Sequence, residues 1–434
     1  MTIDFRQWQR AVEETETFRA QGRVRSLVGL SLRASAPGVR VGDLVHVRPQ
    51  RRPAIEAEVV GFEGEEAVLM PLGTWEGVGP NDPVDIAGAR FQVLCSEALL
   101  GRVVDGLGRP IDGGAPLRGE AWSVEGECPS PLERPRIERP LPLGIRAIDG
   151  LLTLGEGQRI GLFAGSGVGK STLLGQIARH AQADVVITCL VGERGRELRE
   201  FLEDSLGSEG RKRSVVVCAT SDAPALVRLK SAHVATAYAE WFRARGARVL
   251  LMMDSLSRYA RAGREVGLAA GEFPARRGYP PSVFAALPRL VERAGTTAQG
   301  SISAIYTVLV EGGDMEEPVA DEIRGLLDGH IVLDRSIAAR GRFPAIDVLQ
   351  SLSRLMPQIT SAEHRQWAAR LREWLALYES KRDLVLLGAY TRGSDARLDQ
   401  ALQKIDAIES FLRQSSQEQS ELDQALKALR AIAS

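Results

Sequence analysis

The chain has 434 residues, of which 44% are hydrophobic and 26% are charged, and its formal net charge is -1. This length allows one large core with smaller flanking domains, and the composition is too apolar for a disordered chain. A net charge near zero excludes the broad basic field that holds a nucleic-acid backbone, so nucleic acid is not expected as a partner.

A short amphipathic helix is predicted for residues 1–22, where Phe5, Trp8 and Val12 recur at helical spacing. These residues lack the continuous apolar stretch of a secretory signal. No apolar run of about 18 residues occurs elsewhere in the chain, so no membrane span is expected. The protein is therefore expected to be cytoplasmic, at most peripheral to a membrane.

Residues 23–92 contain short apolar stretches separated by Gly and Pro, which are typical of a small β-barrel. Residues 93–358 alternate continuous apolar runs with helix-length segments, which predicts parallel strands joined by crossover helices. Residues 359–434 carry apolar residues at spacings of three and four, which predicts a helical domain. The predicted strands of the central region are 159–164, 185–191, 214–219, 249–253 and 302–310.

A glycine-rich loop lies between a predicted strand and a predicted helix at residues 164–171, which read Ala-Gly-Ser-Gly-Val-Gly-Lys-Ser. Backbone N–H groups of such a loop converge on phosphate oxygens, and the helix N-terminus adds partial positive charge. Lys170 is expected to bridge the β- and γ-phosphates of ATP, and Ser171 to bind Mg²⁺ through its hydroxyl. The predicted nucleotide-binding residues are Gly165, Ser166, Gly167, Val168, Gly169, Lys170, Ser171 and Thr172.

Two carboxylates follow two further predicted strands. Asp254 is expected to hold Mg²⁺ at the C-terminal edge of the sheet, although an Asp that caps a turn gives the same pattern. Glu193 is expected to orient and polarise the water that attacks the γ-phosphate. The alternative for Glu193 is a salt bridge with Arg194 or Arg196.

Three segments together resemble the rotary ATP synthase superfamily: the glycine loop, the motif Gly192-Glu193-Arg194, and residues 344–353. Within it, residues 278–284 and 287–293 resemble the type III secretion ATPases, and the similarity covers nearly the whole chain. The resemblance implies an α/β fold, with a RecA-like parallel-sheet P-loop core, an N-terminal β-barrel and a C-terminal helical domain.

Further site residues are implied by this resemblance alone. Arg354 matches the arginine finger, a cation that reaches the γ-phosphate in a neighbouring subunit. Arg194 joins Glu193 and Lys170 in the catalytic set. Phe343 takes the place of an aromatic ring that stacks on adenine, and Tyr390 is a weaker candidate for a nucleotide contact.

The resemblance also implies a homohexamer that energises protein export by releasing chaperones from cargo and unfolding it. The implied partners are a stator-like regulator, a central stalk protein, chaperone–cargo complexes and the export gate at the cytoplasmic face of the bacterial inner membrane. Two interpretations of the N-terminal helix are open, binding of a regulator or membrane surface and packing on its own barrel. The C-terminal helices likewise either dock cargo or close the ring.

Residues 310–315 and 326–333 favour the injectisome branch over flagellar export, whereas residues 388–390 and 393–395 are equally similar to the flagellar branch. Two other functions are alternatives: the catalytic subunit of a proton-coupled ATP synthase, and a hexameric RNA translocase. The presence of a catalytic Glu and an arginine finger in one chain favours a homohexamer. The few aromatic residues of the predicted barrel disfavour binding of single-stranded RNA.

Overall fold

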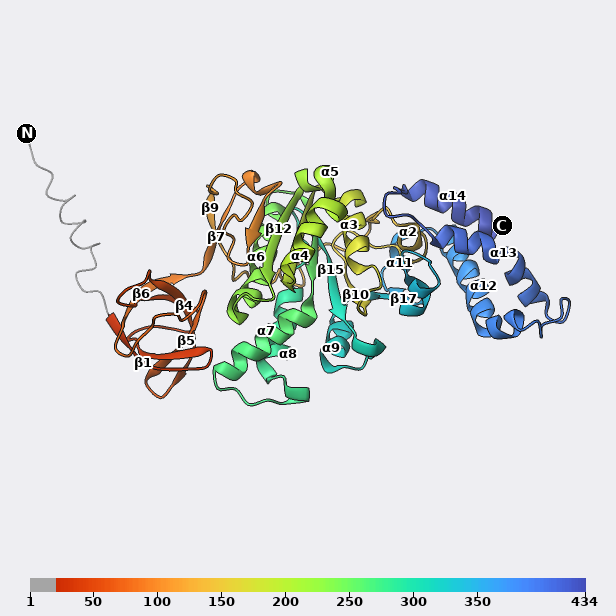
Figure 1. Cartoon of the computed structure of the whole chain (residues 1–434). Helices are drawn as coiled ribbons and strands as arrows, with labels where there is room; N and C mark the ends of the chain where they lie inside the picture. The colour runs from red at the N-terminus through yellow and green to blue at the C-terminus, as the bar shows by residue number, and fades with distance from the viewer. Residues whose placement is uncertain (1–20) are drawn as a thin grey trace, which may run out of the picture. The chain divides into compact units, whose positions relative to one another are not determined.

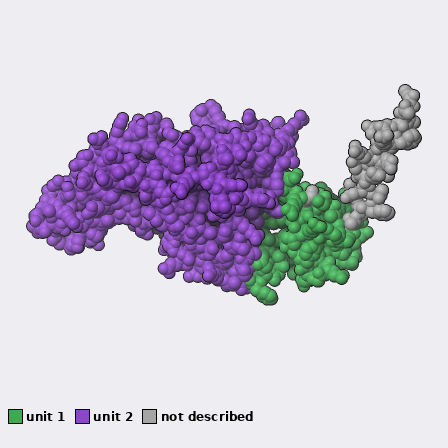
Figure 2. Space-filling view, turned by 180° about the vertical axis from the view of Figure 1, so that it is seen from behind, with its two compact units in different colours: residues 1–92, 224–227, 265–273 green, residues 93–223, 228–264, 274–434 purple. Residues whose placement is uncertain are grey.

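The computed structural model of the protein describes residues 21–434. They form two compact units, coloured separately in Figure 2: unit 1, with residues up to Gln92 together with 224–227 and 265–273, and unit 2, with the remainder. The predicted N-terminal helix lies outside the described residues, except for Gln21 and Gly22, which begin strand β1. In the part of the chain that is described, no helix is both long and apolar enough to cross a membrane.

Unit 1 contains a closed barrel of antiparallel strands in the order β1-β2-β5-β4-β3-β6, as the sequence predicts. Side chains alternate between the inside and the outside of the barrel, so in β2 Leu32 and Ala34 are buried between half-buried neighbours. Val45, Val59 and Leu69 complete the apolar interior. The strands are β1 (Gln21–Val28), β2 (Ser31–Ser35), β3 (Asp43–Val47), β4 (Ile55–Glu63), β5 (Glu66–Pro71) and β6 (Pro83–Arg90).

Unit 2 is built on a nine-stranded sheet with the order β17-β16-β10-β15-β13-β11-β12-β8, and β14 pairs with β15. The strands β16, β10, β15, β13, β11, β12 and β8 are parallel to one another, whereas β17 is antiparallel to β16 and β14 is antiparallel to β15. Every residue of β11 is buried, as expected for a central strand covered on both faces. The strands are β8 (Val103–Asp105), β10 (Arg159–Ala164), β11 (Val185–Glu193), β12 (Ser214–Thr220), β13 (Arg248–Asp254), β14 (Gly295–Thr296), β15 (Ser301–Leu309), β16 (Gly329–Leu333) and β17 (Ile346–Ser353), with a separate pair β7 (Gln92–Cys95) and β9 (Glu120–Ser123).

Helices connect the strands of this sheet and confirm the predicted parallel α/β core (Figure 1). They are α2 (Arg146–Leu151), α3 (Lys170–His180), α4 (Gly195–Glu200), α5 (Gly207–Lys212), α6 (Ala225–Arg243), α7 (Leu256–Ala269), α8 (Pro281–Val291), α9 (Pro318–Leu326), α10 (Arg335–Ala339) and α11 (Met356–Ile359). The π-helix η2 (Phe201–Leu206) and the 3₁₀ turns η1 (Glu97–Leu99), η3 (Arg276–Gly278) and η4 (Glu311–Gly313) complete the connections.

The chain ends in the helices α12 (Ala362–Leu386), α13 (Ala396–Leu412) and α14 (Leu422–Ala433), drawn in blue in Figure 1. Helices α13 and α14 pack on α2. Trp374 of α12 and Phe411 of α13 belong to the same buried apolar cluster as Leu173 and Ile177 of α3. The C-terminal helices therefore share a core with the helix that follows the glycine loop.

Candidate active site

The glycine loop connects the end of β10 to the start of α3, which is the context that a phosphate-binding loop requires. Gly167 and Gly169 have φ angles of 78° and 87°, in the left-handed region that disfavours residues with a β-carbon. Ser171 and Thr172 are exposed in the first turn of α3, whereas Val168 is buried beneath the loop. The loop thus offers backbone N–H groups and a hydroxyl at one open face.

Lys170, Glu193 and Asp254 converge beside this loop. Asp254 ends β13 and Glu193 ends β11, so both carboxylates lie at the C-terminal edge of the parallel strands, where β10 leads into the loop. The Lys170 ammonium forms an ion pair with Asp254 Oδ1 and lies 3.5 Å from Glu193 Oε1. Glu193 and Asp254 are only 5% and 3% exposed, so these charges interact away from bulk water.

Two further residues hold the carboxylates, and the sequence reasoning missed both. Thr307 of β15 donates its hydroxyl to Asp254 Oδ1 at 2.7 Å. Arg258 of α7 donates to Glu193 Oε2 at 3.0 Å and also to the Gly192 carbonyl. A threonine near the C-terminal end of a buried strand and an arginine one helical turn after Asp254 were the available signals.

Burial raises the pKa of Glu193 to about 7, and the neighbouring Asp254 charge adds to the increase. The cations of Lys170 and Arg258 act in the opposite direction. Glu193 Oε1 accepts no hydrogen bond from residues 21–434. A buried carboxylate that accepts no hydrogen bond at one oxygen and has a pKa near neutrality is suited to general-base chemistry.

Phe343 lies against the other side of the glycine loop. Its ring atoms would be 3.5 and 3.6 Å from a β-carbon on Gly169, and its side chain is 46% exposed. The ring lines a cavity of about 860 Å³ that also contains Tyr378, Ser410 and Gln414 from the C-terminal helices and the loop after α13. An exposed aromatic face beside a phosphate-binding loop is a suitable platform for a nucleobase.

The other predicted residues lie away from this cluster. Arg194 is 73% exposed and pairs with Glu197 at 3.5 Å. Tyr390 donates its hydroxyl to Asp399 at 3.0 Å, near the start of α13. Arg354 follows β17 and is exposed.

The position of Arg354 follows from strand direction. Ala164 at the end of β10 pairs with Leu333 at the end of β16, whereas the last residue of β17, Ser353, pairs with Gly329 at the start of β16. The strand rise between these two levels is about 13 Å, in addition to the lateral spacing of the strands. Arg354 thus lies at the end of the sheet where the parallel strands begin, whereas the glycine loop of its own chain lies at the end where they finish.

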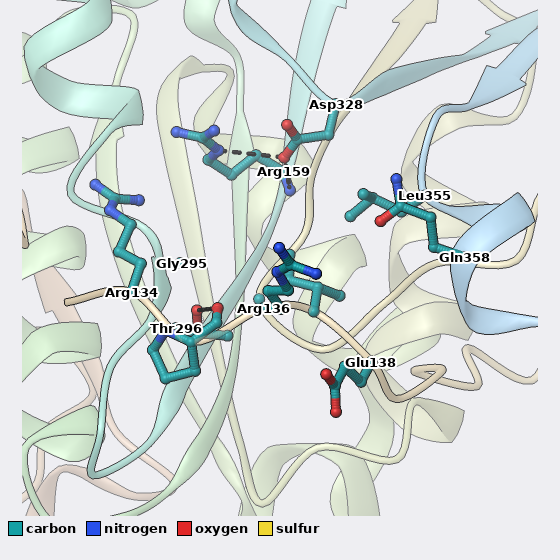
Figure 3. A pocket seen from close by; sticks show the side chains of 12 residues that line it. Arg134, Arg136, Glu138, Arg159, Gly295, Thr296, Asp328, Leu355 and Gln358 are labelled. Atoms are coloured by element: carbon teal, nitrogen blue, oxygen red, sulfur yellow. Dashed lines mark hydrogen bonds and ion pairs between the residues drawn. The ribbon is translucent and has the colours of Figure 1, made fainter. Parts of the chain in front are cut away.

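A second cavity, of about 610 Å³, lies at the end of the sheet where the parallel strands begin, and Asp328, Leu355 and Gln358 help to line it (Figure 3). Its principal cation, Arg159, pairs with Asp328 at 3.3 Å and with Glu292 at 2.6 Å. Arg134 is occupied by backbone carbonyl oxygens, including that of Ala294 at 3.0 Å. Arg159 and Arg134 are thus already ion-paired or hydrogen-bonded, whereas the glycine-rich loop, which is the phosphate-binding motif, lies at the other end of the strands.

The donor set at the glycine loop fits Mg²⁺. Within residues 21–434 no group of three or more His, Cys, Asp or Glu side chains forms a metal cage. Mg²⁺ is usually bound by one or two protein oxygens together with substrate phosphates and water, so a cage is not required. Ser171 and Asp254 supply a hydroxyl and a carboxylate of this kind.

Comparisons with known proteins agree with this geometry. Residues 144–353 match the model of the ATP synthase alpha/beta family, nucleotide-binding domain, and residues 360–431 match the T3SS EscN ATPase C-terminal domain. The chain is 51% identical to a type 3 secretion system ATPase of Xanthomonas euvesicatoria, over 95% of this chain and 94% of that protein. It is 48% identical to a flagellum-specific ATP synthase of Bacillus subtilis, over 97% of each.

This chain belongs to the family of type III secretion and flagellar ATPases. The structure agrees: assembled EscN of the enteropathogenic E. coli type III secretion system is 43% identical and has a TM-score of 0.90, covering 95% of this chain and 100% of EscN. EscN in complex with its central stalk EscO, 44% identical, has a TM-score of 0.88 over the same shares. The predicted superfamily, the fold class and membership of the type III secretion and flagellar ATPases are thereby confirmed.

Proposed function

We propose that this ATP hydrolase works as a homohexamer and energises type III protein export, in the injectisome branch. The observation that carries the function is the convergence of Lys170, Glu193 and Asp254 beside a glycine loop that ends in an exposed Ser171. Relatives of the two branches are 51% and 48% identical, so the preference for the injectisome rests on residues 310–315 and 326–333.

Binding of ATP would begin at the loop, where backbone N–H groups and Lys170 receive the phosphates. In the structure the Lys170 ammonium is paired with Asp254 and lies near Glu193. The γ-phosphate competes for this ammonium and draws it away from the carboxylates. Glu193 Oε1, which has no hydrogen bond from residues 21–434, is then the acceptor that orients the attacking water and takes its proton.

Mg²⁺, when bound through Ser171 and Asp254, would neutralise charge that develops on the β- and γ-phosphate oxygens. Thr307 fixes the Asp254 carboxylate by a 2.7 Å hydrogen bond and so limits its rotation. Arg258 does the same for Glu193. These contacts hold both carboxylates in place before substrate arrives, which reduces the reorganisation needed during the reaction.

Arg354 is proposed to act in the site of a neighbouring subunit. Its position at the sheet edge opposite its own glycine loop supports a role between subunits. Its guanidinium would offset negative charge on the γ-phosphate of the neighbour, and arginine fingers of this type contribute about 10³–10⁵ in rate. Arg194, 73% exposed, is proposed to turn toward the γ-phosphate only in the assembled site.

Mixing of two inactive variants tests the shared site. A Glu193→Gln subunit retains Arg354, and an Arg354→Ala subunit retains Glu193. In a mixed ring, an interface is intact wherever Arg354 of a Glu193→Gln subunit reaches the site of an Arg354→Ala subunit. Random 1:1 mixing should restore about one quarter of the interfaces in a closed cyclic ring. Each variant alone should be inactive, and a 1:1 mixture without measurable hydrolysis would refute the shared-site function.

The proposed partners follow those of the family. EscN forms a complex with its central stalk EscO, and we propose a corresponding stalk protein for this chain. A stator-like regulator at the N-terminal segment, chaperone–cargo complexes at the C-terminal helices, and the export gate at the cytoplasmic face of the bacterial inner membrane complete the proposal. Pull-down with the purified cytoplasmic domain of the export gate tests the last of these.

A further inference from the structure

The loop between α13 and α14, residues 413–421, is fastened to the helix that begins at Lys170. Gln176 of α3 donates its amide to the carbonyl oxygens of Ser415 and Glu418, each at 3.1 Å. Arg179 of the same helix donates to the carbonyl of Ser416. Side chains of α3 thus hold one side of the 413–421 loop through its backbone carbonyl oxygens.

Gln414 lies at the centre of this attachment and is only 3% exposed. Its side-chain oxygen accepts from the Arg146 backbone N–H at 2.9 Å. Its amide nitrogen donates to the carbonyl oxygens of Gly144 at 2.8 Å and Glu418 at 2.9 Å. Both amide protons and one oxygen lone pair are therefore used, as expected for a buried amide whose loss is costly.

The backbone of Gln414 continues this attachment to the candidate base platform. Its N–H donates to the Phe343 carbonyl at 2.9 Å. Arg342, the residue before Phe343, is 4% exposed and pairs with Glu409 of α13 at 3.0 Å. Arg342 is therefore held by α13, and Phe343 is held by the loop that follows α13. The Phe343 ring itself lies against Gly169.

We propose that Gln414 is a positioning residue that holds the Phe343 ring where it can stack on the nucleobase of ATP bound at the glycine loop. The inference rests on the proposed function, since it requires ATP to bind at the glycine loop. Gln414 holds loop 413–421 against α2, the loop holds the Phe343 carbonyl, and the ring is thereby kept at stacking distance from a base whose phosphates occupy the loop. Phosphate contacts come from other groups and do not depend on Gln414.

Comparison of ATP with inorganic tripolyphosphate tests this role, because tripolyphosphate has no base. In Gln414→Ala the dissociation constant and the KM for ATP should rise about tenfold, which corresponds to about 1.4 kcal/mol. The affinity for tripolyphosphate and the kcat at saturating ATP should stay within about twofold of the unmodified protein. Gln417→Ala, an exposed glutamine of the same loop, is the matched control and should change neither affinity.

A double-mutant cycle identifies the route of the effect. In a Phe343→Ala background, Gln414→Ala should change ATP affinity by less than about twofold, since the ring it positions is already absent. Gln414→Glu keeps the acceptor for the Arg146 N–H but turns a carboxylate oxygen toward the carbonyl oxygens of Gly144 and Glu418, so it should raise the KM for ATP at least as much as Gln414→Ala. If circular dichroism shows Gln414→Ala to be unfolded, the same cycle is measured with Gln414→Glu.

Equal weakening of ATP and tripolyphosphate would overturn the inference, because it would mean general damage to the glycine loop. An unchanged ATP affinity in a folded Gln414 variant that hydrolyses ATP would overturn it as well and leave the proposed function intact. Absence of ATP binding by the unmodified protein would instead overturn the proposed function, and this inference with it.

Discussion

Replacement of Glu193 by glutamine should abolish hydrolysis and at the same time stabilise the protein. Gln has the shape of the protonated acid and accepts no proton from water, so kcat should fall by at least about 10²-fold. ATP binding should persist, because Lys170 and the loop N–H groups remain. The loss of activity alone would fit many mechanisms, and the change in stability is what ties it to the buried charge.

The size of the stability change follows from the pKa. Burial and the Asp254 charge raise the pKa of Glu193 from 4.5 to about 7. At 1.36 kcal/mol per pKa unit, the ionised form costs the folded protein roughly 3 kcal/mol relative to the unfolded chain. The folded state binds the proton more tightly, so stability of the unmodified protein falls as pH rises between 4.5 and about 7 and stays low above this window.

Urea unfolding at pH 5 and pH 8 measures this difference. Glu193→Gln should exceed the unmodified protein by as much as about 3 kcal/mol at pH 8, with a smaller gain at pH 5. Glu200→Gln is the control, since the Glu200 side chain is 51% exposed. A Glu193→Gln protein that is less stable at pH 8, or that hydrolyses ATP within a few-fold of the unmodified rate, would refute the reasoning.

Hydrolysis by the unmodified protein should fall about tenfold per pH unit below pH 7, where Glu193 becomes protonated, as a pH–rate profile would show. Arg258→Ala removes a cation that lowers the pKa of Glu193, so the acid limb of that profile should move to higher pH. Thr307→Val deletes the 2.7 Å hydrogen bond to Asp254, worth about 1 kcal/mol, and should raise the Mg²⁺ requirement several-fold in a Mg²⁺ titration. Arg354→Ala should leave ATP affinity of isolated protomers unchanged but abolish the rise of specific activity with protein concentration, measured by dilution series.

The fold was largely predictable because apolar runs and their polar ends are local signals. Each predicted strand of the central sheet matches an observed strand, and the functional carboxylates stand where two of these runs stop, at Glu193 and Asp254. Glycine spacing marked the loop for an equally local reason. The N-terminal boundary was less predictable: Gln21 and Gly22, expected near the end of a helix, begin a barrel strand.

The contacts that complete the site were not predictable, because they join residues far apart in the sequence. Thr307 and Asp254 are 53 positions apart, and Arg258 and Glu193 are 65 apart. Neither pair leaves a periodic pattern, since each depends on which strands become neighbours in the sheet. Arg354 was assigned by resemblance alone, and its location at the far edge required the antiparallel direction of β17.

The charges of the site support the proposal that one protomer does not form a complete active site. Beside the loop, the cations of Lys170 and Arg258 are balanced by the carboxylates of Glu193 and Asp254, so the nucleotide-free cluster is close to neutral. A bound triphosphate adds several negative charges to this partly dry site, and burial of uncompensated charge is costly. Mg²⁺ supplies part of the compensation, and the remainder must come from cations outside the cluster. Arg354 lies at the opposite end of the strands from its own loop, so in the proposed hexamer a neighbouring subunit would deliver it, and assembly would then be coupled to catalysis through electrostatics.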